Sequence, residues 1–295
     1  ENIMGLQIIS AEQRMAEKRG HKIVIMGPSG VGKTTLARTL DSDKTLFMDL
    51  EAGDAAIEGW PIDVIRPRTW GECRDFACFL GGANPSLGND SAYSQAHYES
   101  VLATLGDPSQ FLSKYDTIFV DSITVAGRLC FQYCLQQPEN KSDRSGKLDT
   151  RAAYGMHGRE MMSWLTHLQH IRDKNVVFVG ILDERIDEYS RTIYELQIEG
   201  SKTGRELPGI VDEVITMAIM TGDEKTGTYR SFVCQTLNEW GYPAKDRSGR
   251  LDTLEEPHLG KLLAKLSSDH SNHDKELDFI DPKIANKKEE VTTNV

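Results

Sequence analysis

GPSGVGKTT, residues 27–35, follows the apolar run KIVIM at 22–26 and precedes the helix-like LARTL at 36–40. This is the P-loop pattern, set between a strand and a helix as it must be to work. Its glycines let backbone N–H groups converge on phosphate oxygens, the lysine reaches the β and γ phosphates, and the first threonine offers a hydroxyl to Mg²⁺. The stretch predicts a phosphate site made by Gly27, Pro28, Ser29, Gly30, Val31, Gly32, Lys33, Thr34 and Thr35.

Short apolar runs alternate with helical patterns on either side of this stretch. Such alternation is typical of an α/β fold, a mainly parallel sheet covered by helices on both faces, here with a C-terminal hairpin. Gly, Pro, Ser and Asn make 81–95 and 137–153 read as surface loops. We expect strands at 22–27, 45–50, 117–122, 176–182, 214–220 and 228–237, and helices at 32–41, 69–80, 97–105, 123–136 and 156–173.

Composition narrows the class of protein. The 295 residues are 39% hydrophobic, enough for a sizeable core, and no run approaches the roughly 18 apolar residues of a membrane span. The net charge of −11 argues against coating nucleic acid by bulk charge, and the five cysteines contain no C-x-x-C pair that would suggest zinc. We expect an intracellular protein with an N-terminal segment at 1–20, one ATPase domain at 21–266 and a flexible charged tail at 267–295.

Acidic residues at strand ends are candidates for metal and water chemistry. Mg²⁺ needs a second protein anchor, and Asp121 ends the buried run TIFV. Asp116 precedes that run, so it lies at the opposite edge of the sheet, where a turn role fits. Asp49 and Glu51 share one face of their strand, so spacing alone leaves both open as the group that handles the attacking water. Glu51, nearer the crevice at the strand ends, is the favoured general base.

The order of GPSGVGKTT, LFMDLEAG and TIFVDSIT, then a long polar loop and GMHGREMMSWLTHLQHIRDKNVVFVGILDER, resembles the ATPase core of the RecA family over residues 20–262. More narrowly, it resembles phage-encoded RecA-like ATPases found beside recombination and single-strand-binding genes, some of them single-strand annealing proteins. The resemblance implies a RecA-like P-loop NTPase core using ATP and Mg²⁺. It also implies that Lys33 and Glu51 are catalytic and that Thr34 and Asp121 are metal ligands.

Two DNA-binding loops, at about 135–155 and 184–207, are implied by the same resemblance. Their cations would contact DNA phosphates. Acidic residues are interspersed with these cations, so a solvated surface of mixed charge is an equally open interpretation. The implied DNA-contacting residues are Lys141, Arg144, Lys147, Arg151, Arg185, Arg191, Lys202 and Arg205.

Three further positions correspond to the family only in part. RecA-like proteins commonly end the fourth core strand in a polar sensor of the γ-phosphate, and here Asp183 stands at that place, although phosphate repels a carboxylate unless a cation intervenes. Lys245 and Arg247, in YPAKDRSGRLD, resemble the paired cations that the family supplies to a neighbouring subunit's site. An exposed basic turn is the alternative interpretation of this pair.

Together these features predict an ATP-hydrolysing phage protein acting on single-stranded DNA in recombination, annealing or replication, in the cytoplasm of a bacterial host. The resemblance implies a homo-oligomeric ring or filament, with a single-strand-binding protein as a further partner. The lack of a long apolar run predicts no membrane association. Two alternatives remain. One is a nucleotide-gated adaptor, such as a helicase loader, without essential hydrolysis. The other is a small-molecule kinase with the same P-loop.

Overall fold

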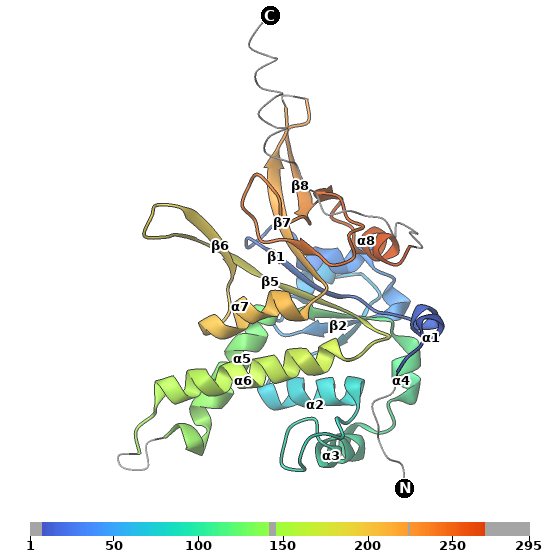
Figure 1. Ribbon diagram of the computed structural model, residues 1–295, viewed down its shortest axis with the longest axis vertical. Coiled ribbons are helices and arrows are strands. Elements are labelled where there is room, and N and C mark those ends of the chain that lie inside the picture. Colours follow the sequence, from blue (N-terminus) through green and yellow to red (C-terminus); the bar gives the residue numbers. More distant parts are fainter. Residues whose placement is uncertain (1–7, 142–145, 224, 269–295) are drawn as a thin grey trace, which may run out of the picture.

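A central sheet organises the molecule (Figure 1). The computed structural model describes residues 8–141, 146–223 and 225–268, beginning with the short helix α1 (Ala11–Ala16). The strands are β1 (Lys22–Gly27), β2 (Thr45–Asp49), β3 (Asp63–Ile65), β4 (Thr117–Asp121), β5 (Asn175–Ile186), β6 (Thr192–Leu196), β7 (Glu213–Thr221), β8 (Thr228–Val233), β9 (Lys245–Asp246) and β10 (Leu254–Glu255).

The strand order is β10-β8-β7-β1-β5-β4-β2-β3. In this order, the strands β7, β1, β5, β4, β2 and β3 are parallel to their neighbours. β8 pairs antiparallel with β7 and β10, and β6 pairs antiparallel with β5. This confirms a mainly parallel α/β sheet with a C-terminal hairpin, the fold of P-loop nucleotide-binding proteins. Since β1 is paired on both sides, all six of its residues are buried, and the P-loop emerges from a fixed strand end.

Helices cover both faces of the sheet (Figure 1). The face carrying Val24 and Phe178 packs against α2, α5 and α6, and the face carrying Ile25 and Val179 packs against η1 and α8. The α-helices are α2 (Trp70–Gly81), α3 (Gln95–Leu105), α4 (Ser109–Lys114), α5 (Ile123–Gln136), α6 (Thr150–Gln169), α7 (Ser201–Ile210) and α8 (Leu259–Leu266); the 3-10 turns are η1 (Thr34–Thr39), η2 (Ser42–Lys44), η3 (Asp54–Ile57) and η4 (Pro138–Asn140).

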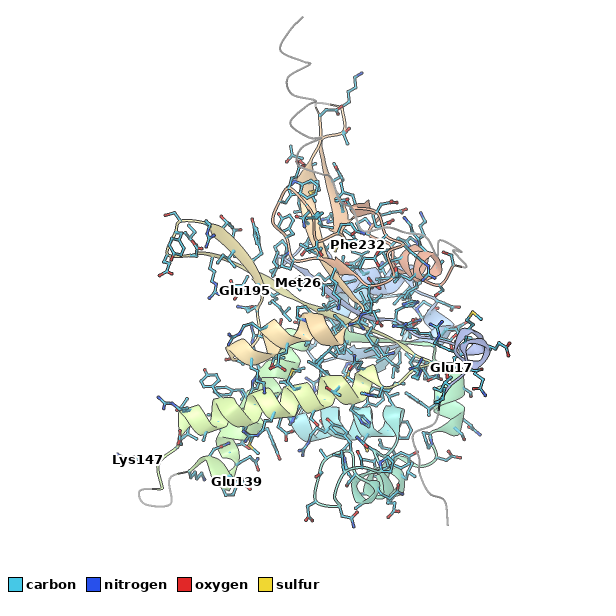
Figure 2. The ribbon with its side chains drawn as sticks, in the orientation of Figure 1. Glu17, Met26, Glu139, Lys147, Glu195 and Phe232 are labelled. Atoms are coloured by element: carbon cyan, nitrogen blue, oxygen red, sulfur yellow. The ribbon has the colours of Figure 1, made fainter. Side chains whose placement is uncertain are left out.

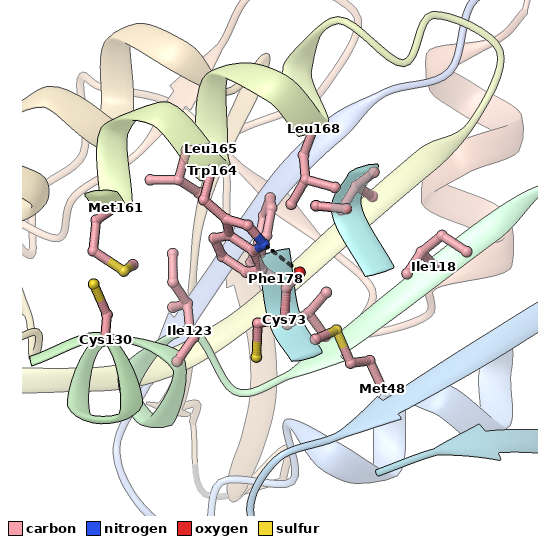
Figure 3. Close-up of a cluster of buried hydrophobic side chains, with 14 of the residues drawn as sticks. Met48, Cys73, Ile118, Ile123, Cys130, Met161, Trp164, Leu165, Leu168 and Phe178 are labelled. Atoms are coloured by element: carbon pink, nitrogen blue, oxygen red, sulfur yellow. Dashed lines mark hydrogen bonds between the residues drawn. The ribbon is translucent and has the colours of Figure 1, made fainter. Parts of the chain in front are cut away.

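A tryptophan anchors the larger core (Figure 3). The Trp164 side chain from α6 lies against Phe178 of β5, with ring centroids 5.8 Å apart. Its indole N–H donates to the Cys73 carbonyl oxygen at 3.1 Å, so a polar atom that burial would otherwise penalise is satisfied. Cys130 and Cys134 are buried thiols, as expected of core residues.

The expected loop at 184–207 is wrong. β5 continues to Ile186, turns back as β6 and leads into α7, so this segment is a hairpin followed by a helix. Asp187 closes the turn, because its side chain accepts the N–H groups of Tyr189 and Arg191. Pro208 lies inside α7, next to the buried Leu207.

The boundaries of two helices also differ from the expectation. The helix after the P-loop is shorter than 32–41, a 3-10 turn over Thr34–Thr39 that stops where Leu40 becomes extended. The helix expected at 156–173 begins earlier, because Asp149 caps it by accepting the N–H of Ala152, and so the loop before it is shorter.

Within the described residues no helix is long and apolar enough to cross a membrane. The expected tail lies, from residue 269 onward, outside the described residues.

Candidate functional site

The P-loop joins β1 to η1 and depends on its glycines. Gly30 and Gly32 have φ of 78° and 106°, in the region that favours glycine. A Cβ on Gly27 would lie 2.6 Å from the Met217 carbonyl oxygen. The Lys33 Nζ donates to the carbonyl oxygens of Gly27 and Pro28, both at 2.9 Å. Burial lowers the pKa of Lys33. A phosphate would stabilise the Lys33 ammonium more strongly than these neutral carbonyls do, because a phosphate is negatively charged.

Asp121 ends β4 as a buried carboxyl, only 3% exposed. Its Oδ2 has no hydrogen-bond partner among the described atoms. Burial raises the pKa of Asp121 to about 6, with Glu51 and Asp49 adding to the rise, while a hydrogen bond from Thr34 and the charge of Lys33 oppose it. A buried carboxyl with an unused oxygen beside the P-loop threonine therefore requires a cation or a proton.

Asp49 and Glu51 are separated by their partners. Asp49 lies opposite Asp121 in the sheet and is buried; it accepts the Gly53 N–H at 3.1 Å and lies 3.4 Å from Arg66. Glu51 is exposed, and its Oε1 accepts the hydroxyl of Ser122. Exposure favours Glu51 as the residue that reaches a water, because Asp49 is buried and its Oδ1 accepts a backbone amide. The Oδ2 of Asp49 lies 3.4 Å from the Arg66 Nε and, like that of Asp121, has no hydrogen-bond partner among the described atoms.

Mg²⁺ fits Thr34 and Asp121. The fit rests on the unpartnered Oδ2 of Asp121 and on the contact of this carboxyl with the Thr34 side chain. Among the described residues, no group of three or more His, Cys, Asp or Glu could hold a metal ion by itself. A magnesium ion here would take its remaining ligands from water and phosphate oxygens, as Mg²⁺ at nucleotide sites does.

Lys147 and Glu195, labelled in Figure 2, lie on two projections on one side of the molecule. The residues expected at DNA loops lie on the segments that form these projections and on α6 and α7. Most cations of the hairpin and α7 have acidic partners: Arg185 pairs with Glu195 at 2.6 Å and Arg191 with Asp187 at 2.8 Å. Lys202 lies 3.8 Å from Glu206, and Arg205 is exposed. Lys141 and Lys147 are exposed between α5 and α6, and Arg151 is exposed in the first turn of α6, whereas Arg144 lies outside the described residues.

Asp183 is exposed on β5, two residues past the point where β5 is in register with Gly27. Its partner across the hairpin is Glu195. A carboxylate in an acidic hairpin gives no positive indication of phosphate sensing, and the role stays a prediction.

Lys245 and Arg247 lie at the other end of the strands, because β9 pairs with the first residues of β7. The Lys245 Nζ donates to the carbonyl oxygens of Pro208 and Val211, the latter at 2.9 Å, and Arg247 pairs with Asp212 at 3.0 Å. Neither cation serves its own P-loop from there. Their action at a neighbouring subunit stays a prediction.

Two acidic residues at the sheet edge opposite the P-loop differ in their surroundings. Glu213, the first residue of β7, is buried at 1% exposure. Burial raises the pKa of Glu213 to about 8, and the adjacent Asp246 adds to the rise. Asp116 matches its expected turn position before β4 and pairs with Lys18 at 2.8 Å.

Two residues beside the P-loop were missed. Ser122 follows Asp121, caps α5 by accepting the Val125 N–H at 3.3 Å and donates to Glu51; a serine directly after a strand-end aspartate was the available signal. Arg230 on β8 donates to the Val31 carbonyl oxygen at 2.7 Å across 199 positions of sequence. No local sequence pattern predicts a contact between residues so far apart in the chain.

Comparisons with known proteins bear on the family of the chain and not on single residues of this site. A family model described as an AAA domain matches residues 19–248, most of the chain. No curated protein matches. Among solved structures, an ATPase from the type III secretion system of pathogenic bacteria is similar at 16% identity with a TM-score of 0.38. The match covers 68% of this chain and 51% of that one, so this chain spans about half the length of that protein.

Proposed function

Because the chain belongs to the AAA domain family of nucleotide-binding proteins, we propose that it binds and hydrolyses ATP in a Mg²⁺-dependent reaction. One observation carries the proposal. The buried Asp121, with an unpartnered oxygen, meets the P-loop threonine at the same sheet edge where Glu51 reaches solvent. A protein that only held phosphate would need the P-loop but not this pair of carboxylates.

Each side chain has a separate task in this proposal. Lys33 leaves the carbonyls of its own loop and contacts the β and γ phosphates. Thr34 and Asp121 hold Mg²⁺, which when bound neutralises charge on the phosphates. Glu51 orients the attacking water and takes its proton, and Ser122 keeps the Glu51 carboxylate in place through its hydroxyl.

We further propose single-stranded DNA as the effector of hydrolysis, in recombination, annealing or replication of phage DNA by a homo-oligomer. Support comes from the projection between α5 and α6, where Lys141 is exposed, and from the adjoining first turn of α6, where Arg151 is exposed. The β5–β6 hairpin supports it less. From Asp183 to Glu195 it carries five acidic residues against two arginines, a net charge of −3, and it would repel a phosphate backbone.

The test is phosphate release from ATP and Mg²⁺ by the wild-type protein and by Glu51→Gln, Asp49→Asn and Lys33→Ala, each with and without single-stranded DNA. We expect Lys33→Ala to lose nucleotide binding and Glu51→Gln to lose hydrolysis while it still binds ATP. Asp49→Asn is the matched carboxylate control. Equal hydrolysis by wild type and Glu51→Gln would point to a nucleotide-gated adaptor, and turnover indifferent to DNA would remove the effector from the proposal.

A paired variant separates the two projections. Lys141→Ala with Arg151→Ala should reduce stimulation by DNA without changing the basal rate, whereas Arg185→Ala with Arg191→Ala, in the acidic hairpin, should leave stimulation nearly unchanged. The opposite ranking would move the proposed DNA contact to the hairpin.

A further inference from the structure

A hollow of about 320 Å³ opens beside the P-loop on the side away from the carboxylates. Gly32 and Thr35 form its near rim, and Leu36 and Met217 contribute apolar lining. Arg230 and Pro257 also line it. The volume is at the lower end of the ~300–1,000 Å³ found for small-molecule sites, so it suits one flat heterocycle and its sugar rather than a larger ligand.

We propose that this hollow receives the base of the bound nucleotide, that Arg230 and Pro257 hold the base by stacking, and that the site consequently prefers purine to pyrimidine triphosphates. The inference rests on the proposed function, since it takes the P-loop to bind a triphosphate.

Strand order fixes which way the nucleotide lies. β4 and β2, which carry Asp121 and lead to Glu51, lie on one side of β1, beyond β5. β7 and β8, which carry Met217 and Arg230, lie on the other side. The phosphate nearest the carboxylates is the one to be released, so the rest of the nucleotide extends toward β7 and β8. There Thr35, the residue after the Mg²⁺ threonine, already borders the hollow.

Both walls are held in place. The Arg230 Nε donates to the Val31 carbonyl oxygen at 2.7 Å, which ties the guanidinium to the P-loop. Pro257 comes two residues before Leu259, whose N–H donates to the Thr39 hydroxyl at 2.9 Å. This hydrogen bond links α8 to η1 and so fixes the distance between Pro257 and the P-loop. Preorganised walls cost little entropy when a ligand is bound.

The chemistry of the walls favours stacking over hydrogen-bond readout. A guanidinium plane stacks on aromatic rings, and a proline ring adds apolar contact. Stacking depends on the area of the base more than on its exocyclic groups, because every base has a π face. Adenine and guanine should therefore bind similarly, and both should bind more tightly than cytosine.

The test compares the Mg²⁺ complexes of ATP, GTP, CTP and inorganic tripolyphosphate, with affinities measured by calorimetry on the wild type, Arg230→Ala, Pro257→Ala and Arg38→Ala. We expect ATP and GTP to bind the wild type roughly tenfold or more tightly than tripolyphosphate, with CTP between them. Arg230→Ala and Pro257→Ala should each lose most of that advantage and keep the tripolyphosphate affinity. Arg38 is the matched control, because it also donates to loop carbonyls, those of Ala56 and Glu58, and does not line the hollow.

The tripolyphosphate affinity separates the possible failures. If Arg230→Ala weakens ATP and tripolyphosphate equally, Arg230 only supports the P-loop through Val31 and the inference is overturned. If the wild type binds ATP no better than tripolyphosphate, the hollow holds no base and the inference again fails, while the proposed function stands. If the wild type binds neither compound, the proposed function fails and the inference falls with it.

Discussion

The raised pKa of Asp121 makes nucleotide binding depend on pH in a way that can be calculated. Burial, aided by Glu51 and Asp49, raises the pKa of this carboxyl to about 6. Mg²⁺ binds the ionised form, so binding requires the proton to leave. The apparent affinity for Mg²⁺ and ATP should then be reduced by a factor of 1 + 10^(pKa − pH).

The factor is about 1.1 at pH 7, about 2 at pH 6 and about 11 at pH 5. The sign follows from the direction of the shift. With a raised pKa, the carboxyl holds its proton over a pH range in which an ordinary aspartate would be ionised, so affinity falls on acidification from pH 7 to pH 5. An aspartate with its ordinary pKa of 3.8 would show almost no change over that interval.

The assay is the dissociation constant of a fluorescent ATP analogue in Mg²⁺ from pH 5 to pH 8, on wild type and on Asp121→Asn. The phosphate groups of the nucleotide titrate in the same range, so the ratio of the two dissociation constants is the quantity to plot; the nucleotide's own titration cancels. The advantage of wild type over Asp121→Asn should shrink about tenfold from pH 7 to pH 5. Parallel curves for the two proteins would refute Asp121 as the metal anchor.

Three further variants test the site and its support. Glu51→Gln should lower the rate of ATP hydrolysis roughly 100-fold or more with little change in ATP affinity, measured by phosphate release and by calorimetry; equal losses in Asp49→Asn would make the two carboxylates indistinguishable. Gly27→Ala should destabilise the protein by roughly 1–3 kcal/mol in urea unfolding, because its Cβ would meet the Met217 carbonyl oxygen at 2.6 Å in a strand paired on both sides, and an unchanged midpoint would show that β7 yields. Glu213→Gln should reduce the loss of stability on going from pH 6 to pH 9. The pKa of Glu213 is raised from 4.5 to about 8, so its stabilising contribution is fully present below pH 4.5 and is lost as pH rises through 8. The pKa of the neighbouring Asp246 is lowered, so that group does not titrate in this pH window. The same pH slope of thermal unfolding in wild type and Glu213→Gln would contradict this prediction.

Local patterns were sufficient for the strands that carry the site. KIVIMG is strand β1 to the residue, and TLFMD and TIFVD are β2 and β4, because buried parallel strands are short apolar runs with a strong signal. Residues at their ends could be assigned to one sheet edge by the rule for parallel strands. The location of Asp121 beside the P-loop follows from that rule alone.

Contacts between distant segments were beyond local patterns. The hairpin at 184–196 was taken for a loop because its strands are exposed and rich in charge, which hides the alternation of a half-buried strand. Arg230 reaches Val31 only because β8 follows β7 and β7 pairs with β1. The choice between Asp49 and Glu51 likewise depended on partners, Gly53 and Ser122, that alternation along one strand does not specify.

The charges around the P-loop explain why metal and nucleotide should bind as a unit. Asp49 is balanced by Arg66 at 3.4 Å, but Asp121 and Glu51 face one lysine, so the site is net negative before a ligand arrives. A triphosphate entering alone would be repelled by these two carboxylates and attracted mainly by Lys33 and the loop amides. A cation between the phosphates and Asp121 reverses the sign of that interaction. The buried Asp121 carboxylate therefore makes the affinity for the nucleotide depend on Mg²⁺.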